Sequence, residues 1–140
     1  MKKDTSEILK ELQSCFDFNE FYSQNSKSLI TETLSDYLNK LLEKHKLTKS
    51  EVIKRSLLNE IYAYQIFSGI RVPERKKLLS LSLGMGLDLE ETQNLLKCSG
   101  YAQLYAKLEF DCIVIYGICK KLSVIEVNTL LFEHDLDTLG

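Results

Sequence analysis

A single proline, Pro73, stands among 140 residues, and the chain has six glycines. Proline interrupts helices and glycine weakens them, so a chain with few of either has little to stop helix formation. Leu, Lys and Glu, which favour helices, are abundant. The apolar share of 44% and the charged share of 27% are those of an ordinary globular protein. The sequence therefore predicts an all-α protein in which most of the chain folds.

Apolar residues recur with helical spacing in segments that turn-forming residues separate. The pattern is clearest over 31–46, where Leu34, Leu38 and Leu42 share one face. We interpret 17–27 as a packed connector with one helical turn, because its apolar residues follow no period. The predicted helices cover 5–16, 31–46, 49–56, 60–67, 73–83, 89–99, 108–121 and 124–134.

Residues that begin and end helices stand at the expected boundaries. Capping boxes are predicted for Thr48 with Glu51, Asp88 with Glu91, and Ser123 with Glu126. Asn59 is a suitable cap for the helix 60–67, and Gly69 for its left-handed end. Pro73 suits a first helical turn, where its missing amide costs nothing, and we expect that helix to stop at 84–86.

No apolar run approaches the roughly 20 residues that a membrane-spanning helix needs. The longest, Cys112–Tyr116, is far shorter. The N-terminus leads into a polar amphipathic segment instead of an apolar signal core. We therefore expect a cytoplasmic protein with no membrane partner.

The four cysteines contain no CxxC pair, and we expect Cys15, Cys98, Cys112 and Cys119 to be buried free thiols. The two histidines, His45 and His134, have no spaced partner, so no metal site is predicted. The stripe Cys112, Ile115, Tyr116 and Cys119 is expected in the core; a homodimer seam is the alternative.

No catalytic arrangement is predicted. Glu90-Glu91 and the pair Glu109 and Asp111 stand at helix starts, where carboxylates interact with the helix dipole. Ser68-Gly69 and Gly84-x-Gly86 follow no strand, which excludes a nucleophile elbow and a phosphate loop. We expect neither an enzyme nor a cofactor.

Charge is unevenly distributed along the chain, although the net charge is −2. Residues 34–86 hold ten basic and five acidic residues, a balance of +5, whereas the rest of the chain carries −7. A basic middle between acidic flanks can attract a polyanion.

Within this basic middle, a short helix, a brief turn and a second short helix follow one another. The segments Leu47-Thr48-Lys49-Ser50-Glu51-Val52, Ser68-Gly69-Ile70-Arg71-Val72-Pro73 and Leu78-Leu79 carry a pattern that resembles the Xre and lambda-repressor-like helix-turn-helix family. The resemblance implies a bundle of about five helices over 31–100, with an N-terminal helical extension over 1–30 and a C-terminal one over 101–140.

The resemblance also implies sequence-specific binding to double-stranded DNA by a transcriptional regulator of Xre type. The helix 60–67 would enter the major groove, with Leu58, Ala63 and Ile66 facing inward. Gln65 would pair with adenine, Tyr64 would donate to a base or phosphate, and Ile61 would touch a thymine methyl group. Asn59 would also face outward, and a homodimer would read two half-sites about 34 Å apart. The expected phosphate contacts are Lys49, Arg71, Arg75, Lys76 and Lys77.

Three positions differ from the family pattern. The family usually has a small residue where Ile53 stands and, because the turn is left-handed, glycine where Leu57 stands. Glu60 places a negative charge at the start of the recognition helix, 60–67. Together with outward Ile61, Tyr62 and Tyr64, it motivates an alternative: a non-catalytic protein-interaction or signalling adaptor on the same scaffold. The acidic residues Glu133, Asp135 and Asp137 could then shield the basic middle.

Overall fold

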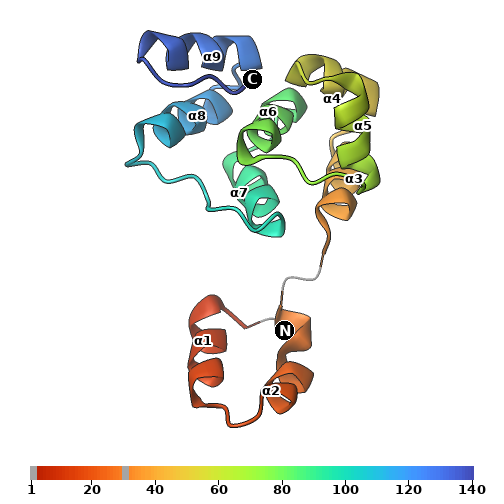
Figure 1. Cartoon of the computed structure of the whole chain (residues 1–140), viewed down its shortest axis with the longest axis vertical. Coiled ribbons are helices and arrows are strands. Elements are labelled where there is room, and N and C mark those ends of the chain that lie inside the picture. The colour runs from red at the N-terminus through yellow and green to blue at the C-terminus, as the bar shows by residue number, and fades with distance from the viewer. Residues whose placement is uncertain (1–2, 30–31) are drawn as a thin grey trace. The chain divides into compact units, whose positions relative to one another are not determined.

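The computed structural model describes residues 3–29 and 32–140, and these residues form helices and no strand. The predicted all-α fold class is confirmed. The chain divides into two compact units, Met1–Thr31 and Glu32–Gly140 (Figure 1). The second unit contains residues 32–100 of the expected domain 31–100 together with the expected extension 101–140.

The first unit is a pair of short helices, α1 (Thr5–Ser14) and α2 (Phe18–Asn25), followed by a 3₁₀ turn, η1 (Ser26–Ser28). The connector predicted over 17–27 is therefore wrong, because most of it is α2. The reason is the cap: the Asp17 carboxylate accepts a hydrogen bond from the Asn19 amide at 3.2 Å. A local capping bond begins a helix without any regular apolar period.

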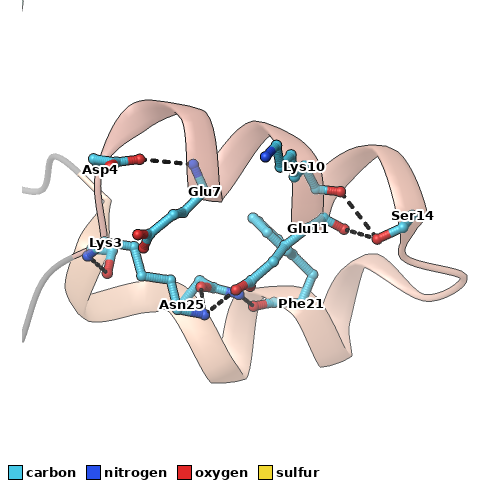
Figure 2. A network of polar contacts seen from close by, with 9 residues as sticks. Lys3, Asp4, Glu7, Lys10, Glu11, Ser14, Phe21 and Asn25 are labelled. Atoms are coloured by element: carbon cyan, nitrogen blue, oxygen red, sulfur yellow. Dashed lines mark hydrogen bonds and ion pairs between the residues drawn. The ribbon is translucent and has the colours of Figure 1, made fainter.

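Polar side chains hold this unit together between its helices. Lys3 donates hydrogen bonds to Glu11 and to Asn25 Oδ1, the latter at 2.8 Å (Figure 2). Among residues 3–29 the buried side chains are Phe21 and Asn25. Helical spacing over 5–16 puts Ile8, Leu9, Leu12, Cys15 and Phe16 on one face, but Leu9, Leu12 and Phe16 are exposed and Ile8 and Cys15 are only partly buried.

The second unit consists of seven helices over the described residues 32–140. They are α3 (Leu34–Lys44), α4 (Lys49–Ser56), α5 (Glu60–Ser68), α6 (Arg75–Met85), α7 (Leu89–Cys98), α8 (Glu109–Cys119) and α9 (Val124–Glu133). The helix α6 lies at the centre and packs against α4, α7, α8 and α9, while α3 packs against α5 and α7 (Figure 1). Every residue from Leu78 to Met85 is buried, which explains why α6 shows no amphipathic stripe.

Gly84 of α6 lies against α4 with no space for a side chain. A Cβ atom at this position would lie 2.1 Å from Ser56 Oγ and 3.0 Å from the Ser56 amide nitrogen of α4. The prediction that the helix stops at 84–86 is only partly right, because α6 continues through Gly84 and ends at Gly86 in a left-handed conformation. Gly84 is thus a packing residue that lets α4 and α6 meet.

Most predicted caps are present. Asn59 Oδ1 accepts from the Tyr62 amide at 3.1 Å, Gly69 has φ +84°, and both bonds of the boxes at Asp88 and Ser123 are formed. At Thr48 the structure shows the bond from the Glu51 amide, at 3.2 Å. Contrary to the prediction, Pro73 is not inside a helix; it precedes Glu74, which occupies the N-cap position of α6 without a side-chain capping bond.

A buried carboxylate links α3 to α7. Glu91 Oε2 accepts hydrogen bonds from Lys44 Nζ at 2.8 Å and lies 2.9 Å from His45 Nε2. Burial alone would raise the pKa of Glu91, but the bonds from Lys44, His45 and the Asp88 amide lower this pKa to about 2. The carboxylate therefore stays charged when α3 and α7 are packed.

The segment 101–108 joins α7 to α8 without helix, and polar bonds fix its path. Arg75 donates to both carboxylate oxygens of Asp111 at 3.0 Å, and its Nε donates to the Ala102 carbonyl at 3.1 Å. The Tyr105 amide donates to the same carboxylate at 2.9 Å. Because Asp111 is buried, this bidentate pair ties the start of α6 to α8.

The outer face of α8 was predicted to be core, and this prediction is wrong. Cys112, Tyr116 and Cys119 are exposed and Ile115 is half-buried, because Val114, Gly117 and Ile118 occupy the inward face. Cys15 and Cys98 are partly exposed, so the expectation of buried thiols is also wrong. The described part of the chain contains no helix long and apolar enough to cross a bilayer.

Candidate nucleic-acid interface

The helices α4 and α5 are joined by the short turn 57–59. Leu57 has φ +59° and ψ +25°, the left-handed conformation that glycine adopts more readily. The Asn59 cap then begins α5. The turn thus has the backbone that the family's usual glycine would favour, although a leucine occupies it.

The end of α5 is fixed by α3. Ser35 Oγ donates to the Phe67 carbonyl at 2.6 Å, and Asn39 Nδ2 donates to the same carbonyl at 3.1 Å. Neither Ser35 nor Asn39 was singled out from the sequence. A polar residue on the inner side of an otherwise apolar helix stripe was the signal that could have found them.

The inner face of α5 contains Ala63, Ile66 and Phe67, all buried. Ala63 and Ile66 were predicted there, whereas Phe67 was not and Leu58 is only partly buried. The opposite face is open: Ile61 is 70% and Tyr64 is 41% exposed. One side of α5 is therefore free to meet a partner.

Gln65 and Arg71 form one polar group at the end of this open face. Arg71 Nε donates to Gln65 Oε1 at 2.8 Å, and the Arg71 guanidinium lies 5.3 Å from the centre of the Tyr62 ring. The bond leaves the amide nitrogen of Gln65 and a second lone pair on its oxygen for another partner. Asn59, by contrast, already uses its side-chain oxygen to cap α5.

Four basic side chains of the α4–α5 region have no salt bridge among the residues that the structure describes: Lys49, Lys54, Arg55 and Arg71. Lys49 Nζ lies 5.9 Å from the centre of the Phe67 ring, which keeps it beside α5. A cation that forms no salt bridge is available to an external anion.

Arg75 and Lys76 are directed elsewhere. Arg75 binds Asp111, and Lys76 Nζ lies 3.7 Å from Asp137 and 5.6 Å from the centre of the Phe110 ring. Both expected phosphate contacts thus engage the segment 101–140. Lys77 is half-buried on the same helix.

A groove of about 420 Å³ runs along the outer side of α4 and α5. It is lined by Ser50, Ile53, Lys54, Leu57, Leu58, Glu60 and Tyr64. The groove is partly apolar and carries one acidic and one basic side chain, Glu60 and Lys54. Because Glu60 and Tyr64 of α5 line it, the groove adds to the surface of α5 that a partner could cover.

The described residues contain no candidate metal site. No three His, Cys, Asp or Glu side chains within 3–29 and 32–140 are arranged to hold a metal ion. Comparisons of the chain with protein-family models, curated proteins and solved structures find no match. The likeness to the Xre family therefore stays a hypothesis carried by the motif residues.

Proposed function

We propose that the protein binds double-stranded DNA in a sequence-specific manner as a transcriptional regulator of Xre type. The observation that carries the proposal is the open face of α5, with Ile61, Tyr64 and Gln65, beside basic side chains that form no salt bridge with any residue the structure describes. Base edges specify a sequence and phosphates position the protein, and this surface offers groups for both.

In this proposal α3–α7 form a lambda-repressor-like bundle and α4–α5 are its helix-turn-helix. The left-handed turn at Leu57 and the bonds from α3 to the end of α5 support that assignment. They hold α5 at a fixed angle, so that its outer face can enter a groove as a rigid rod.

The side chains of this surface have two kinds of proposed role, base recognition and phosphate contact. Gln65 pairs with adenine while Arg71 holds its oxygen in place, and Ile61 touches a thymine methyl group. Lys49, Lys54, Arg55 and Arg71 contact phosphates. Arg75 and Lys76 are left out of the interface, because internal partners occupy them.

The test is a titration of the full chain with duplexes selected from a random-sequence pool, at several salt concentrations. Four neutralised phosphates predict a slope of about −3 to −4 in a plot of log affinity against log salt. Absence of binding to any duplex at low salt would overturn the proposal.

Matched variants separate the two kinds of contact. Lys49→Ala, which removes a cation that makes no contact with Gln65, should weaken binding to every duplex and reduce the salt slope by about 1. Gln65→Ala should cost about 1–3 kcal/mol at one base pair and relax the preference there. Lys107→Ala, an exposed cation outside α4 and α5, serves as the control and should change neither quantity.

A protein-interaction adaptor is the second candidate, and the groove beside Glu60 favours it. An apolar segment with a basic residue would fill the groove and pair with that carboxylate. Glu60→Gln discriminates the two functions: it should tighten duplex binding by removing a repulsion, but weaken a basic protein partner. A protein partner that depends on Glu60, with no duplex binding, would replace the first proposal.

A further inference from the structure

The outward face of α8 carries an uncharged stripe at helical spacing. Cys112, Tyr116 and Cys119 are exposed and Ile115 is half-buried, at positions i, i+4, i+7 and i+3. Leu108, the residue that precedes α8, is 55% exposed and continues the same face. Soluble proteins seldom leave such a contiguous face of a helix uncovered.

The order of residue types along the stripe is nearly the same from either end of the helix. A cysteine stands at each end and the two bulky residues, Ile115 and Tyr116, stand side by side at the middle. A two-fold axis through that midpoint would bring Cys112 opposite Cys119 of the second copy, and Ile115 opposite Tyr116. An interface between identical copies requires this kind of self-complementary surface.

The charges at the ends of the stripe have opposite signs. Glu109 begins α8 and Lys120 follows its end, and both are exposed on the same side as Tyr116. In an antiparallel pair, Lys120 of each copy would lie within about two residues, or ~3 Å along the axis, of the other copy's Glu109. Glu109 also lies 3.5 Å from His134 of its own chain, an exposed contact that leaves its second oxygen available.

From the self-complementary stripe and its opposite end charges, we infer that the protein forms a homodimer in which α8 packs antiparallel against α8 of a second copy. The antiparallel arrangement also places the positive end of each helix dipole beside the negative end of the other. This interface uses α8 and is independent of the proposed DNA interface on α4 and α5.

Sedimentation of the full chain without DNA, under reducing conditions, tests the inference. The expected mass is twice the monomer mass of 16.1 kDa. Tyr116→Arg places two like charges at the two-fold axis and should weaken the dimer at least tenfold. Val72→Arg, at a residue 72% exposed outside α8, is the matched control and should remain dimeric. Circular dichroism verifies that both variants fold.

Disulfide cross-linking with the oxidant diamide tests the orientation. Cys112→Ser keeps Cys119, and Cys119→Ser keeps Cys112, so neither variant alone should form the expected link. Their mixture should give a cross-linked dimer, with the Cys112–Cys119 peptide identified by mass spectrometry. A Cys112–Cys112 link within Cys119→Ser would overturn the antiparallel arrangement, and a monomeric wild-type chain at every concentration would overturn the dimer.

Discussion

The two units of the chain are built from similar capped helices but differ in what stabilises them. None of the ten residues of α1, all of which the structure describes, is buried, and α2 buries Phe21 and Asn25. In the second unit, by contrast, apolar side chains from α3 to α9 form one cluster around α6. Caps and periodicity thus set where helices begin and end, while burial sets how stable those helices are.

The same contrast holds for two carboxylate–lysine pairs. Glu91 is 8% exposed at its side chain and receives bonds from Lys44 and His45, whereas the Glu11 side chain is 37% exposed beside Lys3. Hydrogen bonds from Lys3 and Asn25 lower the pKa of Glu11, but water screens this pair. The Glu91–Lys44 pair should therefore contribute more to the free energy of unfolding than the Glu11–Lys3 pair.

The largest expected effect is the loss of the buried carboxylate Asp111. Asp111→Ala removes the buried carboxylate that binds both the partly buried Arg75 guanidinium and the Tyr105 amide, and should lower the free energy of unfolding by about 3–5 kcal/mol. Urea denaturation measures the change. Asp137→Ala is the control, because its contact with Lys76 is at the surface and should contribute at most ~1 kcal/mol. Equal losses for both variants would contradict the larger contribution expected of the buried pair.

Glu91 should make the second unit sensitive to acid. A carboxyl group whose pKa falls from 4.5 to about 2 on folding contributes about 3 kcal/mol above pH 4.5. This contribution disappears as the pH falls from 4.5 towards 2, because the unfolded chain then binds the proton more readily. Glu91→Gln should thus be less stable than wild type at pH 7, and the difference should shrink in that window. Glu43→Gln, on the exposed side of α3, should shift the urea midpoint little at any pH.

Gly84→Ala should destabilise the chain by about 1–3 kcal/mol, because its Cβ would overlap Ser56 Oγ. A loss of stability would be informative, because replacing glycine with alanine within a helix is otherwise stabilising. Ser82→Ala, also buried in α6, is the matched control. Ser82 Oγ has no hydrogen-bond partner among the described residues, so its removal should leave the urea midpoint unchanged or raise it.

The smallest effect is expected in the first unit. Glu11→Gln should leave the main urea transition unchanged, because the carboxylate it alters is screened by water. Hydrogen exchange measures the difference between the units directly: amides of α1 should exchange faster than those of α6, with or without the substitution. A midpoint shift as large as that of Asp111→Ala would contradict the distinction between the two units.

The sequence predicts the local features of this fold well, because a few neighbouring residues determine them. The caps at Asn59, Asp88 and Ser123 and the left-handed Gly69 all depend on contacts within about four residues. The inward direction of Ala63 and Ile66 likewise follows from helical spacing.

The features that the sequence does not predict depend on residues distant along the chain. Arg75 resembles a free cation until Asp111, 36 residues later, is brought beside it. In the sequence Gly84 indicates the end of a helix, and its packing role becomes evident only from its position against Ser56 of α4. Of the candidate site, the exposure of Ile61 and Tyr64 follows from spacing, whereas the bond between Gln65 and Arg71 depends on the path of the chain after Gly69.

The enclosure of α6 has a consequence for the order in which the protein is made. A ribosome releases α6 before α8 and α9, which cover part of it. During that interval the stretch Leu78–Met85, which is buried in the folded protein, is partly exposed in the nascent chain and prone to aggregate. Slow translation of the residues that follow would prolong the interval, so the yield of soluble protein should depend on how quickly the last two helices are synthesised.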